Sequence, residues 1–200
     1  MKHVDIVLSG VGGQGILTLA SIMGMAAIIE GYDTKVAEVH GMAQRGGSVV
    51  CHVRIGEKVS SPLVMEGSAD MVISLELSET LKVLQYLKSK RGVVVLNSNA
   101  LPPPISMILD FQYPSLEAIL EELKGIAGEV YVINAHEIAS SIGSPQSANI
   151  VMLGSAWATG KLALSEESIM KAISRTFRKD AAKINQKAFE EGARIVKKLL

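Results

Sequence analysis

The sequence predicts an α/β fold: a Rossmann-like, doubly wound and mostly parallel sheet with an inserted hairpin and a helical C-terminus. Short apolar runs typical of buried strands alternate with helical patterns, and a glycine-rich turn joins the first strand to the first helix. Hydrophobic residues make up 48% of the 200 residues and aromatic residues only 4%, so aliphatic side chains build the core. A chain of this length fits one domain, and we expect residues 1–200 to form it.

The glycine-rich turn has the pattern G-x-G-x-x-G between Gly10 and Gly15. It follows an apolar run over residues 4–9, typical of a strand, and precedes a helical pattern over residues 16–30. In this context Gly10 is expected to make the tight turn, Gly12 to let a ligand approach the backbone, and Gly15 to let the helix pack close to the strand. The helix N-terminus would offer free N–H groups to an anion.

A short second strand is expected over residues 35–39, joined to the first by a right-handed crossover in a parallel sheet. The loop that follows it, residues 40–47, would lie at the edge where open parallel sheets bind ligands. Within it, Arg45, Gly46 and Gly47 suit an anion-binding nest. A simple bend into the next strand explains the two glycines equally well, and the sequence leaves both interpretations open.

The middle of the chain continues the alternation of strands and helices. Residues 48–55 alternate in hydrophobicity, and after a tight turn we expect residues 58–64 to return as their hairpin partner. Further strands are expected over 69–75, 93–96 and 129–134. Helices are expected over 78–90, with Leu81, Leu84 and either Leu87 or Tyr86 inward, and over 115–124.

The C-terminal part is expected to be helical. Pro145 would lie in the first turn of a buried helix within residues 145–164, whose small residues allow close packing on the sheet or on another subunit. Ser165 would cap the next helix and Asp180 the last one. The apolar stripe of the last helix is expected at Ile184, Ala188, Ile195 and Leu199.

Composition and charge argue against several classes of protein. Lys+Arg and Asp+Glu number 20 each, so the chain lacks the basic excess of a general nucleic-acid binder. Polar residues and Gly24 interrupt the first helix, so no membrane span is expected, and the N-terminus has no signal-peptide pattern. Cys51 is the only cysteine, so no internal disulfide can form. These features indicate a cytoplasmic protein.

Metal and cluster binding are not expected in this chain. A single cysteine cannot hold an iron–sulfur cluster or a zinc ion by itself. His40 and His52 have no recognised metal-ligand spacing, so hydrogen-bonded structural roles are the simpler interpretation. Cys51 is expected to be a packing residue, with His52 on the opposite face of its strand.

The glycine turn alone leaves the ligand open. The acidic residue that would hold the ribose of a dinucleotide is Glu38, but Val39 and His40 follow it, so it would lie inside the second strand. An independent NAD(P)- or FAD-binding Rossmann-type oxidoreductase is therefore one alternative. An anion or a partner's cofactor at the turn is another, and an assembly module whose turn binds no ligand is a third.

Several stretches resemble the gamma-type domain of the 2-oxoacid:ferredoxin oxidoreductases. Within that family the likeness is greatest to the beta subunits of indolepyruvate:ferredoxin oxidoreductases, and it covers nearly the whole chain. The run His-Gly-Met-Ala-Gln-Arg-Gly-Gly is its most specific part. The stretches that carry the resemblance are residues 10–15, 38–49, 61–63, 66–70 and 147–154.

The resemblance implies a subunit of a complex that decarboxylates aryl 2-oxoacids oxidatively, forms an aryl-acetyl-CoA and reduces ferredoxin. A large partner subunit would carry thiamine diphosphate and the iron–sulfur clusters, in a hetero-oligomer with two copies of each chain. This chain would bind no cofactor, would have no catalytic residue of its own and would be inactive alone. Residues expected to face a ligand or the partner's cofactor are Gly10, Gly12, Gly13, Gln14, Gly15, His40, Gln44, Arg45, Gly46, Gly47 and Asn149.

Overall fold

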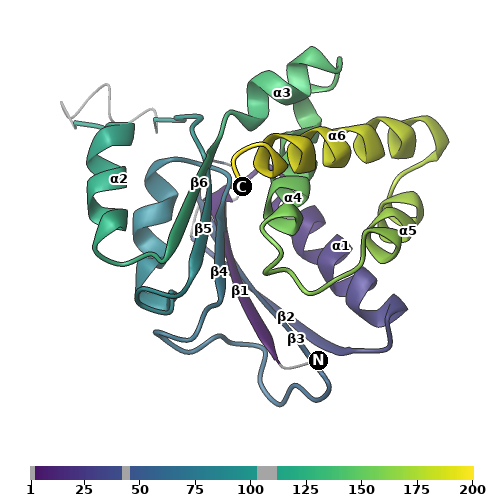
Figure 1. Ribbon diagram of the computed structural model, residues 1–200, viewed down its shortest axis with the longest axis horizontal. Helices are drawn as coiled ribbons and strands as arrows, with labels where there is room; N and C mark the ends of the chain where they lie inside the picture. The colour runs from purple at the N-terminus through teal and green to yellow at the C-terminus, as the bar shows by residue number, and fades with distance from the viewer. Residues whose placement is uncertain (1–2, 42–45, 103–111) are drawn as a thin grey trace.

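A six-stranded sheet forms the centre of the molecule, with helices on both of its faces (Figure 1). The computed structural model describes residues 3–41, 46–102 and 112–200. The strands are β1 (Val4–Val11), β2 (Asp33–His40), β3 (Ser48–Gly56), β4 (Met71–Ser74), β5 (Val93–Asn97) and β6 (Glu129–Ile133), and they lie in the order β2-β3-β1-β4-β5-β6.

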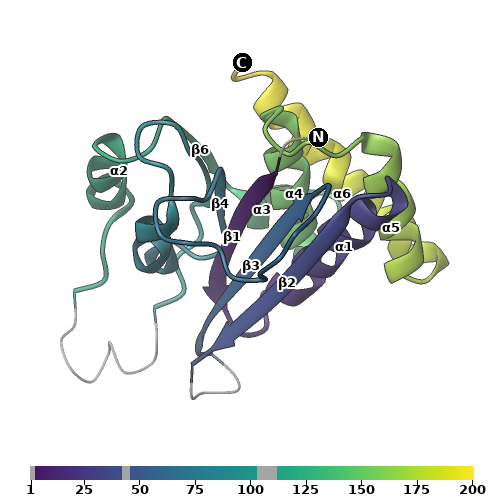
Figure 2. The ribbon, with the colours of Figure 1, turned by 90° about the horizontal axis from the view of Figure 1, so that it is seen from below.

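The helices divide between the two faces of this sheet (Figures 1 and 2). One face carries α1 (Ile16–Ile29), α4 (Ala148–Ala158), α5 (Glu166–Thr176) and α6 (Lys179–Lys197), and their apolar residues form the larger core cluster with the sheet. The opposite face carries the 3-10 helix η1 (Ser78–Tyr86) and α2 (Leu116–Lys124) over a smaller core. Beyond the edge of the sheet lie α3 (Ala135–Ser141) and the short 3-10 helix η3 (Pro145–Ser147). The prediction of a doubly wound α/β fold is confirmed.

The sheet is mixed in a way that the sequence did not indicate. β1, β4, β5 and β6 pair in parallel, but β3 lies between β1 and β2 and is antiparallel to both. The first two strands therefore run in the same direction, as the expected crossover requires, but they are not neighbours. The hairpin in the structure joins β2 to β3, which places β2 at the edge of the sheet.

Residues 58–64 form no strand, contrary to expectation. Both edges of β3 are already occupied by β1 and β2, so no partner position remains for a returning strand. The segment instead crosses the face of β3: the guanidinium of Arg54 donates to the carbonyl oxygens of Ser61 (3.0 Å) and Leu63 (3.3 Å), and the Val64 amide donates to Nδ1 of His52 (3.3 Å). These side-chain contacts replace the predicted ladder.

Two glycines, Gly154 on α4 and Gly192 on α6, let these helices pack closely against each other. A Cβ added at Gly154 would lie 1.9 Å from the Phe189 carbonyl oxygen, and one added at Gly192 would lie 2.0 Å from the Val151 carbonyl oxygen. Only glycine at both positions lets the two backbones approach so closely. The small residues of α4 thus pack against α6.

Several helix details differ from expectation. The segment predicted as an amphipathic helix over 78–90 is a 3-10 helix that ends at Tyr86, and Leu81 on it is 37% exposed. The last helix begins after Arg178 instead of Asp180, which lies in its first turn. Two residues expected in its apolar stripe are exposed: Ile184, because the helix is turned so that Gly192 and its neighbours face α4, and Leu199, which lies beyond the end of the helix at Lys197.

Cys51 and His52 lie on opposite faces of β3, as predicted. Cys51 is buried in the larger core, and burial together with the charge of Glu38 raises the pKa of its thiol to about 12. His52 lies against Tyr86 on the other face, with the two rings edge to face at 5.0 Å, and burial lowers its pKa. Both residues are therefore neutral packing groups at pH 7.

Candidate ligand pocket at the carboxyl edge of the sheet

The glycine turn connects β1 to α1 with a geometry that differs in detail from the prediction. Gly10 lies inside β1, opposite Val49, so it does not make the turn. Its missing side chain leaves room for Gln14 and Leu75, because a Cβ there would lie 2.7 Å from Oε1 of Gln14. The turn itself depends on Gly13 (φ 105°) and on Gly15 (φ 82°), the residue that precedes α1.

Gly15 packs against α4 and not against the strand. A Cβ at this position would lie 2.4 Å from Nδ2 of Asn149, which donates a hydrogen bond to the Gly15 carbonyl oxygen (3.1 Å). Asn149 was predicted as a site residue from sequence, and the structure brings it next to the glycine turn. The hydrogen bond fixes the start of α1 against the start of α4.

The backbone amides of the turn are partly used by the protein itself. Gly12, expected to approach a ligand, donates instead to the Gly47 carbonyl oxygen (2.9 Å), and the Gln14 amide donates to Val11 (3.1 Å). Within the described ranges, the amides of Gly13, Gly15 and Ile16 have no acceptor. These free donors at the N-terminus of a 14-residue helix give the turn a preference for a negatively charged or carbonyl-bearing group.

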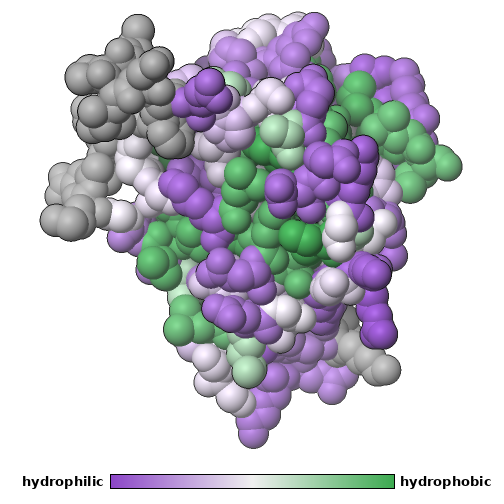
Figure 3. Space-filling model, turned by 90° about the vertical axis from the view of Figure 1, so that its left-hand side faces the viewer, coloured by the Kyte–Doolittle hydropathy of each residue, from purple (hydrophilic) through white to green (hydrophobic). Residues whose placement is uncertain are grey.

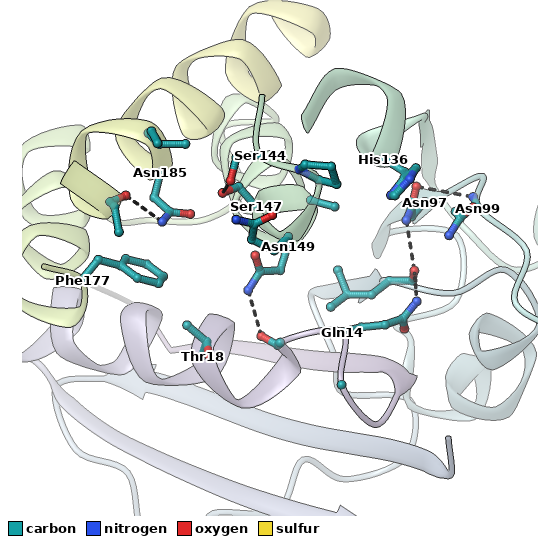
Figure 4. A pocket seen from close by; sticks show the side chains of 18 of the residues that line it. Gln14, Thr18, Asn97, Asn99, His136, Ser144, Ser147, Asn149, Phe177 and Asn185 are labelled. Carbon is teal, nitrogen blue, oxygen red and sulfur yellow. Dashed lines mark hydrogen bonds between the residues drawn. The ribbon is translucent and has the colours of Figure 1, made fainter. Parts of the chain in front are cut away.

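Two side-chain amides fix the ends of neighbouring strands beneath the turn (Figure 4). Gln14 accepts from the Val11 amide (2.8 Å) and donates to the Leu75 carbonyl oxygen after β4 (3.1 Å). Asn97, at the end of β5, donates to the same carbonyl oxygen (3.0 Å) and accepts from the Ala135 amide (3.1 Å). The carboxyl ends of β1, β4 and β5 are thereby held in one rigid floor.

A cavity of about 490 Å³ lies above this floor. It lies above the sheet at the boundary between β1 and β4. On one side of this boundary the sheet continues from β1 through β3 to β2, and on the other side it continues from β4 to β6. Such a switch point is where open α/β sheets bind ligands. Figure 4 shows Asn97, Asn99 and His136 at one end of the cavity, Asn149 in the middle, and Phe177 at the other end.

The described residues that line this cavity include no Asp, Glu, Lys or Arg. Asn185 is 7% exposed and donates to the Ala181 carbonyl oxygen (2.8 Å), which leaves its Oδ1 toward the cavity as an acceptor (Figure 4). The hydroxyls of Ser144 and Ser147, both nearly buried, are hydrogen-bonded to each other (2.8 Å). The pocket thus offers neutral donors and acceptors on an otherwise apolar wall.

The structure brings together part of the predicted site. Gly13, Gln14, Gly15 and Asn149 line the cavity, whereas Gly10 and Gly12 lie beside it. The β2–β3 connection reaches the glycine turn through the hydrogen bond from Gly12 to Gly47. Three predicted residues remain apart from the cavity: His40, exposed at the end of β2 and paired with Glu38, and Gly46 and Gly47 on the β2–β3 connection.

Gln44 and Arg45 lie outside the described residues, so the predicted nest around Arg45 stays a prediction. Gly46 adopts a φ of 74°, which suits glycine. His40 Nε2 lies 3.2 Å from Oε2 of Glu38, which accounts for this histidine as a surface hydrogen-bond partner.

Sequence reasoning missed most of the pocket wall. Asn97 directly follows the apolar run 93–96 at the carboxyl end of a strand, so the rule used for the glycine turn could have found it. Phe177 and Asn185 gave no such signal, because only the packing of α5 and α6 brings them to the cavity.

Two buried carboxylates hold the chain beside the pocket. Glu76 is fully buried and accepts hydrogen bonds from the Ser78 hydroxyl (2.8 Å), the Leu101 amide (3.0 Å) and the Tyr113 hydroxyl. Burial and this hydrogen bond raise the pKa of Tyr113. Glu79 accepts from the hydroxyl of Ser48 at the start of β3. Leu101 lines the pocket, so Glu76 fixes part of its rim.

These features define an α/β ligand-binding domain of the Rossmann type with an uncharged pocket at its switch point. In the part of the chain that the structure describes, no group of His, Cys, Asp and Glu could hold a metal ion, and no helix is long and apolar enough to cross a membrane. Comparison with known proteins identifies the family. The chain belongs to the pyruvate ferredoxin/flavodoxin oxidoreductase family, whose model matches residues 5–195.

Named relatives that align with this chain over nearly their full length support the family assignment. The indolepyruvate oxidoreductase subunit IorB of Thermococcus kodakarensis is 41% identical, with 100% of this chain and 99% of the relative covered. The IorB subunit of Pyrococcus horikoshii is 40% identical with the same coverage. The gamma-type resemblance and its indolepyruvate branch, expected from sequence, are confirmed.

Solved structures share the fold. The gamma subunit of a keto/oxoacid ferredoxin oxidoreductase from Geobacter sulfurreducens superposes with a TM-score of 0.70 at 24% identity, over 96% of this chain and 98% of that one. A 2-oxoglutarate:ferredoxin oxidoreductase from Magnetococcus marinus, solved with coenzyme A bound, superposes with a TM-score of 0.75 at 20% identity. The match covers 100% of this chain but 32% of that chain.

Proposed function

We propose that this chain is the smaller subunit of an indolepyruvate (arylpyruvate):ferredoxin oxidoreductase. The complex oxidises and decarboxylates an aryl 2-oxoacid, transfers the aryl-acetyl group to CoA and passes the electrons to ferredoxin. Identity of about 40% to IorB subunits along the whole chain supports this function. In this proposal residues 1–200 form a single gamma-type domain that acts in the cytoplasm.

The chemistry is divided between two chains in this proposal. Thiamine diphosphate and iron–sulfur clusters belong to a larger partner, and two copies of each chain form the complex. The single cysteine supports the division, since Cys51 is buried and its raised pKa keeps it a thiol, whereas cluster ligation needs several thiolates. The chain is therefore inactive alone and contributes binding and orientation.

The observation that carries the proposal is the pocket at the glycine turn. The arm of CoA between its thiol and its phosphates is a neutral chain with two amide groups. The pocket suits it with an uncharged lining and with Oδ1 of Asn185 left as an acceptor. The free amides of Gly13 and Gly15, together with Arg45, suit an anionic group of CoA, of the substrate or of the partner's cofactor. CoA is thus proposed as the co-substrate that this chain helps to hold.

The sheet order argues against the dinucleotide alternative. In a dinucleotide-binding domain, the acidic residue that holds the ribose ends the strand beside β1. Here β3 occupies that position, and Glu38 lies inside edge strand β2, paired with Cys51 of β3.

An apolar surface suits the larger partner. Val39 is 51% exposed and lies opposite Val50, on the sheet face away from α1; Leu63 and Met65 are 51% and 74% exposed. Figure 3, viewed from the side of η1 and α2, shows hydrophobic areas among hydrophilic surface. These exposed apolar residues are proposed to contact the larger partner.

Co-expression with a thiamine- and cluster-bearing subunit tests the proposal. We expect the two chains to co-purify and to reduce ferredoxin in a reaction that depends on CoA and an aryl 2-oxoacid. Val39→Glu should weaken assembly, whereas Ile28→Glu, at a 64% exposed position on α1, should not. A lone chain with no thiamine- and cluster-bearing partner would contradict the proposal.

Arg45→Ala tests the site within the assembled complex. Loss of a charge-assisted hydrogen bond of about 1.5–3 kcal/mol corresponds to a fall in kcat/KM of roughly tenfold to a hundredfold. Arg91→Ala, at an exposed position, is the matched control and should leave the kinetics unchanged. Unchanged kinetics for Arg45→Ala would remove this residue from the site.

A further inference from the structure

The junction of α5 and α6 concentrates positive charge. Residues 171–187 contain six Lys and Arg but a single acidic residue, Asp180, although the whole chain has no net charge. The cations follow helical spacing: Lys171 and Arg175 lie one turn apart on α5, and Lys179 and Lys183 lie one turn apart on α6. The two pairs therefore form two rows along neighbouring helices.

The two rows border one continuous concave surface. A hollow of about 900 Å³ is lined by Arg178, Lys179 and Lys183, and a second of about 360 Å³ is lined by Lys171 and Arg175. The side chains of Ser174 and Gln186 line both hollows and are hydrogen-bonded to each other (2.9 Å) across the two helices. We name this surface, with its five cations, the α5–α6 basic face.

Few of these charges are neutralised within the protein. Lys171 pairs with Glu167 (2.6 Å), but Arg175, Arg178, Lys179 and Lys183 have no acidic partner in the described ranges. All five side chains belong to exposed residues.

The cations on α6 oppose the stability of that helix. The N-terminus of a helix carries a partial positive charge, and α6 begins with Arg178 as its cap residue and Lys179 as its first residue, without a side-chain capping bond. Acidic residues at these positions would be more favourable for folding. The positive face therefore fits a role in recognition better than a role in folding.

The geometry points to a protein surface as the partner. Both hollows are wide and shallow, and the cations spread over two helices instead of converging on one buried point, as they would around a phosphate or another small anion. The described residues that line the hollows include only the half-buried Phe177 as an aromatic, so bases of a nucleic acid find no stacking platform. We infer that the α5–α6 basic face docks an acidic segment of a partner protein.

Charge reversal on α6 tests this inference without weakening the fold. The full chain carries Lys179→Glu and Lys183→Glu, and the matched control carries Lys58→Glu and Arg91→Glu, which change the net charge equally at exposed positions elsewhere. Because Glu suits the start of a helix, the first variant should melt no lower than the wild type. A lost interaction then cannot be assigned to misfolding.

The probe is a fluorescent oligoglutamate peptide, with duplex DNA and inorganic triphosphate as competing anions. Reversal on α6 should weaken peptide binding roughly tenfold at about 0.1 M salt and reduce its salt dependence, whereas the control should change it less than about twofold. Equal losses in both variants would show a mere effect of net charge and overturn the inference. Tighter binding of DNA or triphosphate, abolished by the same reversal, would also overturn it.

Discussion

The close contact between α4 and α6 predicts that Gly192→Ala destabilises the protein. The added Cβ would lie 2.0 Å from the Val151 carbonyl oxygen and 3.1 Å from the Ser155 amide nitrogen, both backbone atoms that cannot rotate away. Ordinary contact begins at 3.4 Å, so the helices must separate or tilt. Overpacking of a well-packed core costs about 1–3 kcal/mol.

The helical preference of alanine opposes this cost. Replacement of glycine by alanine inside a helix favours folding by about 1 kcal/mol. Because the contact is with backbone, we expect the upper part of the range and a net loss of about 2 kcal/mol in the free energy of unfolding. For a chain of this length, that loss lowers Tm by roughly 4–8 °C.

Gly24→Ala on α1 provides the control. Its Cβ would lie 3.6 Å from Cγ2 of Val36 and 3.9 Å from two side-chain atoms of Thr34, all ordinary contacts, so the variant should be up to about 1 kcal/mol more stable. Urea unfolding of both variants and the wild type measures the difference. If Gly192→Ala matched Gly24→Ala in sign and size, the close approach of α4 and α6 would be refuted.

The same substitution connects packing with the pocket. Asn149 lies on α4 and Asn185 on α6, and both line the cavity. Separation of the helices moves these amides apart, so Gly192→Ala should raise the KM for CoA in the assembled complex, whereas Gly24→Ala should not.

Three further predictions concern single side chains. Burial opposes ionisation of Glu30, but hydrogen bonds from Ser168 and Ser165 outweigh it and lower the pKa of this carboxyl. The stabilising effect of Glu30 is therefore present above about pH 4.5 and is lost as the pH falls. Glu30→Gln should lower the free energy of unfolding by about 1 kcal/mol at pH 7 and by less near pH 3 in urea titrations. With its pKa raised to about 12, the Cys51 thiol should react with a disulfide reagent at pH 8 only when the protein unfolds, and fast labelling of the native chain would contradict its burial. Thr34→Val should add about 1 kcal/mol of stability, because the Thr34 hydroxyl oxygen is buried without a hydrogen-bond partner among the described residues; a loss in the same urea assay would reveal an unseen partner.

Local patterns in the sequence were sufficient for most elements of the fold. Gly15 and the apolar run before Gly10 predicted a strand, a glycine turn and a helix, and Ser165 predicted a helix start that the structure shows, with the Ser165 hydroxyl accepting from the Ser168 amide. These features depend on neighbours within a few residues, so the sequence expresses them directly. Strand order does not depend on near neighbours, because residues 58–64 and β2 were both candidates for the same edge of β3.

The candidate site divides in the same way. The sequence alone determined the glycine turn, with its free amides at a helix start, and the family resemblance that identified the chain. Only the tertiary structure decided that Gly12 bonds to Gly47, that Gly15 faces Asn149, and that α5 and α6 bring Phe177 and Asn185 to the pocket. The physical reason is distance along the chain: the wall of the pocket comes from segments more than a hundred residues apart, and only the packing of helices on the sheet sets which side chains meet there.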